Sequence, residues 1–411
     1  MHWWHTRNIN GVNSGIKSKC SDDLLYLPIV LADYIEKTGD DGLLSVTAYY
    51  LDSPPLERES ERYETPARSD IRESVYRHCL RALYAAERIG RHGLILMGSC
   101  DWNDAFSLVG EKGIGESVFS TMLYIVAAEA FLPFTEKLGD TEASAHLRER
   151  VAFFRKSIEE NAFFGDRYAR AFCDDGTVIG IKGCEECEID ILSQAFAVLA
   201  GLNPDRARTA LKVAFDNLYD RKNKILRLFS PPFTNGRARV GYIRGYVAGI
   251  RENGGMYTHG ALWGALACLK VGFIEEALLI LDAASPAKRS ACKDEAGKYK
   301  NEPYAVSADI YGGDFGGRGG WSWYTGAASW YYRIVLEHLL GLRFGAGSTL
   351  ISAKPRVELE CTIDFDGARL KIIADNSIKA ATLDNETASF PLAVPNGEHT
   401  LYIPTELTSE R

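Results

Sequence analysis

The chain has 411 residues, of which 46% are hydrophobic, enough for one large domain or for a large and a small one. Its formal net charge is −8 and it has no long basic run, so we expect no nucleic acid among its partners. No apolar run reaches the length of a membrane span, about 18 residues, and the N-terminus is unlike a signal peptide. We therefore expect a cytoplasmic protein with no membrane partner.

Apolar residues recur with a helical period through about the first 340 residues. The segment 189–202 is apolar on more than one face, which indicates burial on most sides, whereas 141–161 carries one charged face. Alternation of inner and outer helices is typical of an α/α toroid. Nine helices fall short of the twelve in a closed six-hairpin barrel, so either short helices escape detection or the chain starts inside the first hairpin. The predicted helices are 22–38, 70–89, 116–138, 141–161, 189–202, 205–218, 258–271, 274–284 and 327–340.

The pattern changes near Phe344. Short runs at 357–363, 369–374 and 399–403 alternate with period two and are separated by Gly and Asp-Asn. They predict a small antiparallel β domain over 344–411, which is too small to be the catalytic part. The chain is therefore expected to be dominated by helices over 1–343 and to end in this β domain.

The nine cysteines are scattered singly, apart from Cys184 and Cys187, which form one CxxC. A single pair with no histidine close by is a weak signal for zinc. We expect reduced thiols, most of them packed in the interior, and neither a metal nor another cofactor.

The densest polar motif is Asp101-Trp102-Asn103-Asp104. It follows an apolar run and precedes a helical pattern, so it is expected to be a loop at a helix end. A Trp can stack on a pyranose face and a carboxyl group can protonate a glycosidic oxygen, so the motif suits sugar chemistry. A solvated turn with a helix-capping Asp is the alternative.

Three more segments carry concentrated chemistry. Ser21 and Asp23 lie before a helix, where Ser21 could be its cap. A loop rich in charge and glycine leads to His259, and GRGGWSWYTG leads through Thr325 into another helix. Backbone N–H groups at such places can bind an anion, although a structural histidine and a tight aromatic corner are the alternatives. Together they suggest a site for a sugar plus an oxyanion.

The motifs HWWH, CSDDLLYLP, SCDWNDAF, GIRENGGMYTH, NEPY and GRGGWSWYTGAASWYYR follow one another in a family's order. They resemble the inverting glycoside phosphorylases that include cellobiose and chitobiose phosphorylases and the C-terminal domain of cyclic β-1,2-glucan synthases. The resemblance spans most of 2–343 and implies an (α/α)6 catalytic barrel, with a β-sandwich before it and a small β domain after it. Since the chain begins at the barrel, it would be a fragment, a decayed paralogue, or one part of a split enzyme with a separate sandwich polypeptide; a homodimer is a further expectation.

The same resemblance assigns roles to individual residues. Lys17 and Lys19 stand where the family has arginines; lysine keeps the charge but loses the bidentate fork on phosphate. The motif around Ser99 and Cys100 also departs from the family's glycines. The resemblance implies Asp104 as general acid, Asp23, Trp102, Asp101, Glu252, Ser99 and Tyr246 as sugar-binding residues, and Lys17, His259, Thr325 and Gly326 as the phosphate pocket.

The implied reaction is a single displacement on an oligosaccharide or glucan. Asp104 protonates the leaving oxygen while inorganic phosphate, the co-substrate, attacks the anomeric carbon from the opposite face and yields an α-sugar 1-phosphate. A hydrolase would need a second carboxylate as base, whereas phosphate is already a nucleophile. Two alternatives stay open: a carbohydrate-binding, catalytically impaired remnant, and a phosphate-independent hydrolase or transglycosylase.

Overall fold

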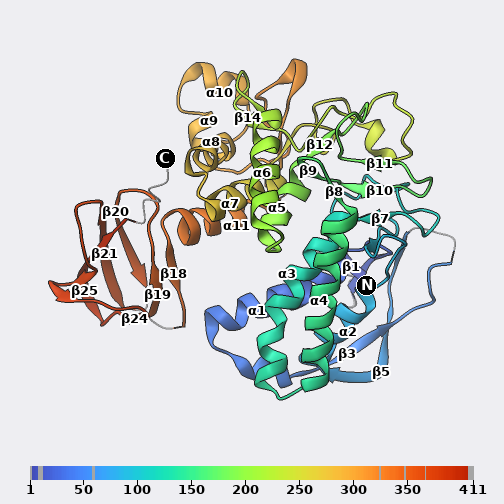
Figure 1. Cartoon of the computed structure of the whole chain (residues 1–411). Helices are drawn as coiled ribbons and strands as arrows, with labels where there is room; N and C mark the ends of the chain where they lie inside the picture. The colour runs from blue at the N-terminus through green and yellow to red at the C-terminus, as the bar shows by residue number, and fades with distance from the viewer. Residues whose placement is uncertain are drawn as a thin grey trace.

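The computed structural model describes residues 2–7, 13–57, 61–323, 325–346, 349–365 and 367–405, and a helical body with a β unit at its C-terminal end (Figure 1). A helix lies in each of the nine segments where the sequence predicts one. The helices are α1 Tyr26–Thr38, α2 Val75–Ala86, α3 Val118–Lys137, α4 Thr141–Asn161, α5 Ile191–Leu199, α6 Pro204–Leu218, α7 Thr258–Val271, α8 Ile274–Ala284, α9 Pro286–Arg289, α10 Lys293–Tyr299 and α11 Ala327–Arg333, which continues into a π-helical turn, Ile334–Leu339.

The helices begin at capping side chains, and these do not always coincide with the ends of the apolar period in the sequence. The predicted helix 70–89 begins only at Val75, because Ser74 caps it and the charged run before it is strand β5. In the same way Asp190 caps α5, and the Ile189–Asp190 pair is strand β12. The sequence does not predict α9 and α10, which are short and lack an apolar stripe.

Consecutive helices pack in pairs, with one buried and one half-exposed member. α3 and α7 are buried on nearly all sides, whereas α4 and α8 bury one face. Helices α1, α3, α5, α7 and α11 contact one another in that order. Ion pairs then join the last to the first: Arg333 reaches Asp33 on α1 at 2.9 Å, and Glu337 lies 2.6 Å from Lys37.

Helix α3 is the one helix in the described part of the chain that is long and apolar enough to cross a membrane by length and composition. In its most apolar window, 67% is buried inside the protein. It packs against α1, α4 and α5 in the main core. Its apolar residues are therefore those of a core helix.

The N-terminal strands are absent from the sequence prediction. β2 pairs with β1 on one side and with β4 on the other, and β3 pairs with β5 in an antiparallel arrangement. β3 and β5 carry charged and aromatic residues with little burial, so they give no apolar period to detect. The strands are β1 His2–Arg7, β2 Asn13–Ser18, β3 Thr47–Asp52, β4 Glu61–Glu64 and β5 Ala67–Ser74.

Two-residue strands and short 3-10 turns join the helices at the ends of the bundle. These connections form small ladders, of which β11-β10-β7-β6 has four strands. The strands are β6 Ile95–Leu96, β7 Glu116–Ser117, β8 Phe163–Phe164, β9 Arg167–Tyr168, β10 Ala171–Phe172, β11 Val178–Ile179, β12 Ile189–Asp190, β13 Tyr219–Asp220, β14 Ile225–Leu226, β15 Phe229–Ser230, β16 Met256–Tyr257 and β17 Asp309–Ile310; the 3-10 turns are Asp23–Leu25, Asp41–Ser45, Tyr242–Gly245 and Gly313–Phe315.

The C-terminal β unit has its own hydrophobic core, which runs from Leu342 to Ile403. The three predicted strands are present as β20, β21 and β25. The strands of this unit pair antiparallel as predicted, except that β21 and β25 pair in parallel. The chain between them is long enough to form the β22–β23 hairpin and return in the same direction. The strands are β18 Leu342–Phe344, β19 Thr349–Ala353, β20 Leu359–Phe365, β21 Ala368–Asp375, β22 Thr382–Leu383, β23 Glu386–Thr387, β24 Leu392–Ala393 and β25 Gly397–Pro404. The boundary at 343/344 between two domains stays a prediction.

Candidate active site

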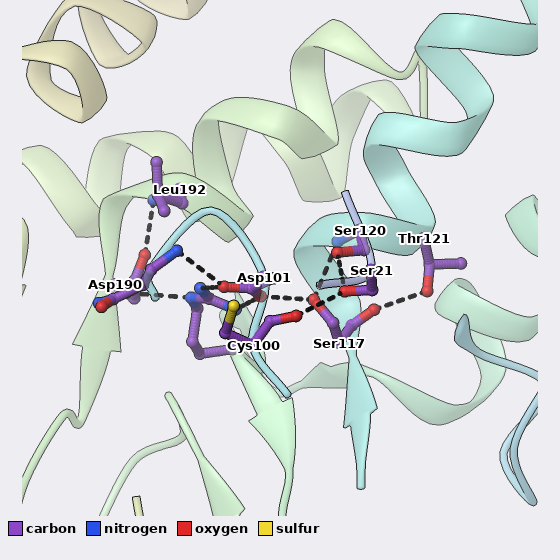
Figure 2. A network of polar contacts seen from close by, with 10 residues as sticks. Ser21, Cys100, Asp101, Ser117, Ser120, Thr121, Asp190 and Leu192 are labelled. Carbon is purple, nitrogen blue, oxygen red and sulfur yellow. Dashed lines mark hydrogen bonds and ion pairs between the residues drawn. The ribbon is translucent and has the colours of Figure 1, made fainter. Parts of the chain in front are cut away.

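The loop that carries the Trp-Asn-Asp motif is anchored by Asp101, which is buried between β6 and the start of α3 (Figure 2). Arg170 donates to both carboxylate oxygens, at 2.6 and 2.7 Å. Ser117, the N-cap of α3, donates to Oδ2 at 2.6 Å, and the backbone N–H of Asn103 donates to Oδ1 at 3.0 Å. Each oxygen of Asp101 therefore has two partners, which fix the turn on which Trp102 and Asp104 sit.

Arg170 is fully buried, between the rings of Phe106 and Phe119 at 5.0 and 5.6 Å. Its Nε lies 3.4 Å from Oδ2 of Asp190, the residue that caps α5. Burial raises the pKa of Asp190 to about 6, and the guanidinium opposes that rise. The buried ion triad Asp101–Arg170–Asp190 thus joins the motif loop to the starts of two helices.

The segment before Asp23 is tied to the motif loop along its backbone. Cys20 and Cys100 form a disulfide, so the expectation that all thiols are reduced is wrong. The pairing of residues 19–21 with 98–100 brings their Cα atoms to 4.6 Å, a contact that two cysteines 80 positions apart do not reveal in sequence. Ser21 also donates to the Cys100 carbonyl and lies 2.8 Å from Ser120 (Figure 2). The free cysteines are Cys79, Cys173, Cys184, Cys187, Cys268, Cys292 and Cys361.

Two adjacent carboxyl groups follow this disulfide. Asp23 accepts a hydrogen bond from Ser18 at 2.8 Å, and burial raises its pKa. Asp22 is buried, and burial, followed by the charges of Asp23 and Asp101, raises its pKa well above the usual range. Ser99, expected to bind sugar, accepts from the backbone N–H of Lys19 at 3.1 Å. The sequence analysis assigns no role to Asp22, although this residue adjoins Asp23 and is more deeply buried.

Asp104 is exposed at the tip of the motif loop, where its carboxyl group can meet a substrate. The hydroxyl of Tyr242 donates a hydrogen bond to it; burial, the charge of Asp104 and this hydrogen bond raise the pKa of Tyr242. The charge of Asp104 also acts on Glu252, Tyr246 and Tyr257, whose pKa values are all raised, chiefly by burial. These four side chains therefore lie within electrostatic reach of Asp104.

Trp102 orients the histidine that the sequence places at the start of α7. Its indole N–H donates to Nδ1 of His259 at 3.3 Å. Since an indole nitrogen only donates, Nδ1 is the acceptor and the ring proton of the neutral imidazole lies on Nε2. Nε2 is buried and has no hydrogen-bond partner in the structure. His259 thus holds one N–H donor ready for an oxygen atom.

The remaining predicted phosphate residues divide into two groups. Thr325 accepts from the backbone N–H of Ala327 at 2.9 Å, which leaves its hydroxyl proton free to donate, and Gly326 next to it is exposed. Trp330 lies in the helix that follows, and its ring centroid is 6.2 Å from that of His259. Helix α11 therefore brings Thr325 and Gly326 towards α7. Lys17 instead donates to Ser53 Oγ and to the carbonyls of Ser53 and Pro54, at 2.6 to 3.2 Å. Its three N–H groups are taken, so its assignment to phosphate gains no support from the geometry.

The structure therefore gathers Asp104, Trp102, Glu252, Tyr246 and His259 around the motif loop, and ties Asp23 and Ser99 to it through the disulfide segment. Asp101 is beside them, but its oxygens are occupied by the protein, so the sugar contact assigned to it stays a prediction. The residues that the sequence reading missed are Asp22, Arg170, Tyr242 and Tyr257. A lone buried arginine gives no sequence signal, whereas Tyr257 lies within the motif GIRENGGMYTH and Tyr242 lies shortly before Tyr246.

The depressed pKa of His259 predicts a pH dependence of stability. Burial lowers this pKa to about 4 from an ordinary 6.5, so between these values the unfolded chain binds more protons than the folded one. Stability should fall by about 3 kcal/mol as pH drops from 6.5 to 4. The measurement is the free energy of unfolding against pH, compared with His259→Gln, which removes this contribution. Parallel curves for the two proteins would contradict the expectation.

Comparison with known proteins gives a family profile and a set of relatives that agree with each other. The family profile described as "Glycosyl hydrolase 94 superfamily, catalytic domain" matches residues 3–341. The chain is 36% identical over 385 residues to the cyclic beta-(1,2)-glucan synthase NdvB of Rhizobium meliloti, covering 92% of this chain and 14% of that protein. It is 31% identical over 343 residues to the solabiose phosphorylase of Paenibacillus borealis (80% and 41%), and 28% identical over 387 residues to an N,N'-diacetylchitobiose phosphorylase of Vibrio proteolyticus (90% and 45%). The chain thus spans less than half the length of these relatives, and its own residues belong to the glycosyl hydrolase 94 superfamily.

Proposed function

We propose that the chain catalyses inverting phosphorolysis of a β-glucoside, with inorganic phosphate as co-substrate and an α-sugar 1-phosphate as product. The observation that carries the proposal is the buried, unpartnered Nε2–H of His259, which Trp102 orients. A buried donor without a partner costs free energy, and an oxyanion is a strong acceptor for it. Two of the relatives are phosphorylases by name, which supports the same reaction class.

The roles of the residues follow from their surroundings. Asp104 donates its proton to the leaving oxygen, and Tyr242 holds its carboxyl group in place. Asp23 and Asp22 bind hydroxyl groups of the sugar whose bond is cleaved, with Trp102 against its face. His259 and Thr325 hold phosphate for attack on the anomeric carbon from the face opposite Asp104. The reaction then inverts the anomeric configuration in one step and needs no cofactor.

We also propose that the helical body is an α/α toroid. The order of contacts among α1, α3, α5, α7 and α11, and the ion pairs that join α11 to α1, support a closed ring. In such a ring the loops at one end share a mouth, so residues far apart in sequence can act together. A closed arrangement of six hairpins, and a division of the chain at 343/344, remain part of the proposal.

A hydrolase is the second candidate, because Glu252 lies within electrostatic reach of Asp104. An inverting hydrolase uses such a second carboxyl group to activate water. Glu252 is buried, however, and its Oε2 lies 3.3 Å from Nε of Arg251. Incubation of β-1,2-, β-1,3- and β-1,4-linked gluco-oligosaccharides with and without phosphate separates the two candidates. Phosphate-dependent formation of sugar 1-phosphate supports the proposal, and free sugar at a phosphate-independent rate supports the hydrolase.

Substitution of His259 is expected to affect phosphate more than sugar. His259→Leu removes the donor, and a charge-assisted hydrogen bond contributes about 1.5–3 kcal/mol, so KM for phosphate should rise roughly 10- to 100-fold. His259→Gln places an amide N–H near the Nε2 position and should raise KM much less. The measurement is the rate of sugar 1-phosphate formation against phosphate concentration. Equal losses in the two variants, or a change confined to KM for the sugar, would contradict this role.

A further inference from the structure

Two exposed rings, one half-buried ring and a guanidinium lie in a row that leads away from the candidate acid. Tyr242, whose hydroxyl contacts Asp104, is 48% exposed. Its ring lies 6.1 Å from that of Tyr246, at a nearly perpendicular angle. The guanidinium of Arg251 lies 4.9 Å from the Tyr246 ring and 4.4 Å from the ring of Trp321, which is 51% exposed. We call Tyr242, Tyr246, Arg251 and Trp321 the aromatic strip.

The strip is held rigidly by the protein beneath it. Arg251 has a positive φ of 51°, a conformation that is costly for a residue with a side chain. Its backbone N–H donates to Asp309 at 3.0 Å, and Glu252 lies against its Nε at 3.3 Å. On the other side, Arg244 in the turn that carries Tyr242 is ion-paired with Glu186 at 2.7 Å. Side chains that are ordered before binding lose less entropy when a ligand arrives.

The chemistry of the strip fits a carbohydrate chain. Ring faces stack on the C–H faces of pyranoses, and a guanidinium donates to their hydroxyl groups. The separations along the strip are comparable with the width of a sugar ring. Because the strip begins at Asp104, the ligand that lies on it continues from the leaving oxygen on the acceptor side.

We propose that the aromatic strip is an extended acceptor-side subsite that binds the second and later sugar residues beyond the cleaved bond, so that the substrate is an oligosaccharide chain rather than a disaccharide. The inference rests on the proposed function for its direction, since Asp104 marks the leaving group. It concerns binding, however, and can be tested without turnover.

The test measures binding of gluco-oligosaccharides of two to six units, of the three linkages named above, to the Asp104→Asn protein by calorimetry. The affinity of at least one linkage should increase with chain length. Trp321→Ala, at the outer end of the strip, should weaken binding of the six-unit chain roughly tenfold and leave the two-unit ligand unchanged. Trp321→Phe, which keeps a ring, should recover part of the loss.

The chain offers a matched control on the β3–β5 hairpin. Tyr49 is 42% exposed and carries the guanidinium of Arg68 at 4.3 Å, the same chemistry as Trp321 with Arg251. Tyr49→Ala should leave all affinities unchanged. Affinities that do not depend on chain length, absence of oligosaccharide binding, or equal effects of the Tyr49 and Trp321 variants would overturn the proposal. Phosphate-independent hydrolysis with intact length dependence would overturn only the phosphorylase.

Discussion

Replacement of Asp104 by asparagine is expected to lower kcat by roughly 10²–10⁴-fold while the protein stays folded. The side chain is exposed, so the substitution buries no new polar group. An amide has nearly the shape of the acid and can still accept the hydrogen bond from Tyr242, but it cannot deliver a proton to the leaving oxygen. The measurement combines steady-state rates of sugar 1-phosphate formation with a denaturation curve for each protein.

Tyr242→Phe is the matched control, because it removes only the hydroxyl that contacts the acid. Its kcat should fall by less than that of Asp104→Asn, since the proton donor itself remains. A substrate with a good leaving group, such as an aryl glucoside, needs less protonation and should restore part of the rate to Asp104→Asn. Wild-type rates in Asp104→Asn would show that another carboxyl group is the acid.

Replacement of Arg170 by methionine is expected to destabilise the fold by about 3–5 kcal/mol, because it leaves two buried carboxyl groups without their cation. Asp101→Asn should cost a similar amount by leaving Arg170 with one fewer anion. Both losses should appear in the free energy of unfolding rather than as a loss of activity per folded molecule as large as that of Asp104→Asn.

A double-mutant cycle separates the ion pair from the packing around it. The cycle compares Arg170→Met, Asp101→Leu and the variant with both, which removes cation and anion together. The cost of the double variant should be clearly smaller than the sum of the costs of these two single variants. Additive costs would mean that Arg170 and Asp101 contribute to the free energy of unfolding through side-chain volume alone. The same cycle at Lys212 and Asp216, an exposed pair at 2.6 Å, should give a coupling of less than about 1 kcal/mol.

The sequence predicts the helices and the C-terminal strands well because each has a periodic pattern within one short window. The errors lie where the pattern is not local. β5 carries charged residues on its exposed face and pairs with a strand about twenty positions earlier, so its segment looked like the start of a helix. The parallel pairing of β21 with β25 depends on the path of the chain between them, which no alternation of residues records.

The residues of the candidate site also divide into those that a local motif predicts and those that depend on contacts made only in the fold. Asp104, Trp102 and His259 lie in motifs whose chemistry can be inferred from a few consecutive residues. Arg170 is 69 positions from Asp101, and Cys20 is 80 positions from Cys100, so these contacts exist only once the chain has folded. Lys17 illustrates the converse: its charge suggested phosphate, but in the fold its ammonium group donates to Ser53 and Pro54.

The buried ion triad also limits how this protein can change during evolution. Loss of Asp101 or Arg170 alone passes through an intermediate with an unpaired interior charge, at a cost comparable with much of the stability of a domain. These positions are therefore expected to vary together or not at all. The exposed rings of Tyr242 and Trp321 meet no such barrier, because surface substitutions change stability little. Descendants of this chain can therefore change the sugars that they bind, while the buried ion triad that fixes the loop of Asp104 stays unchanged.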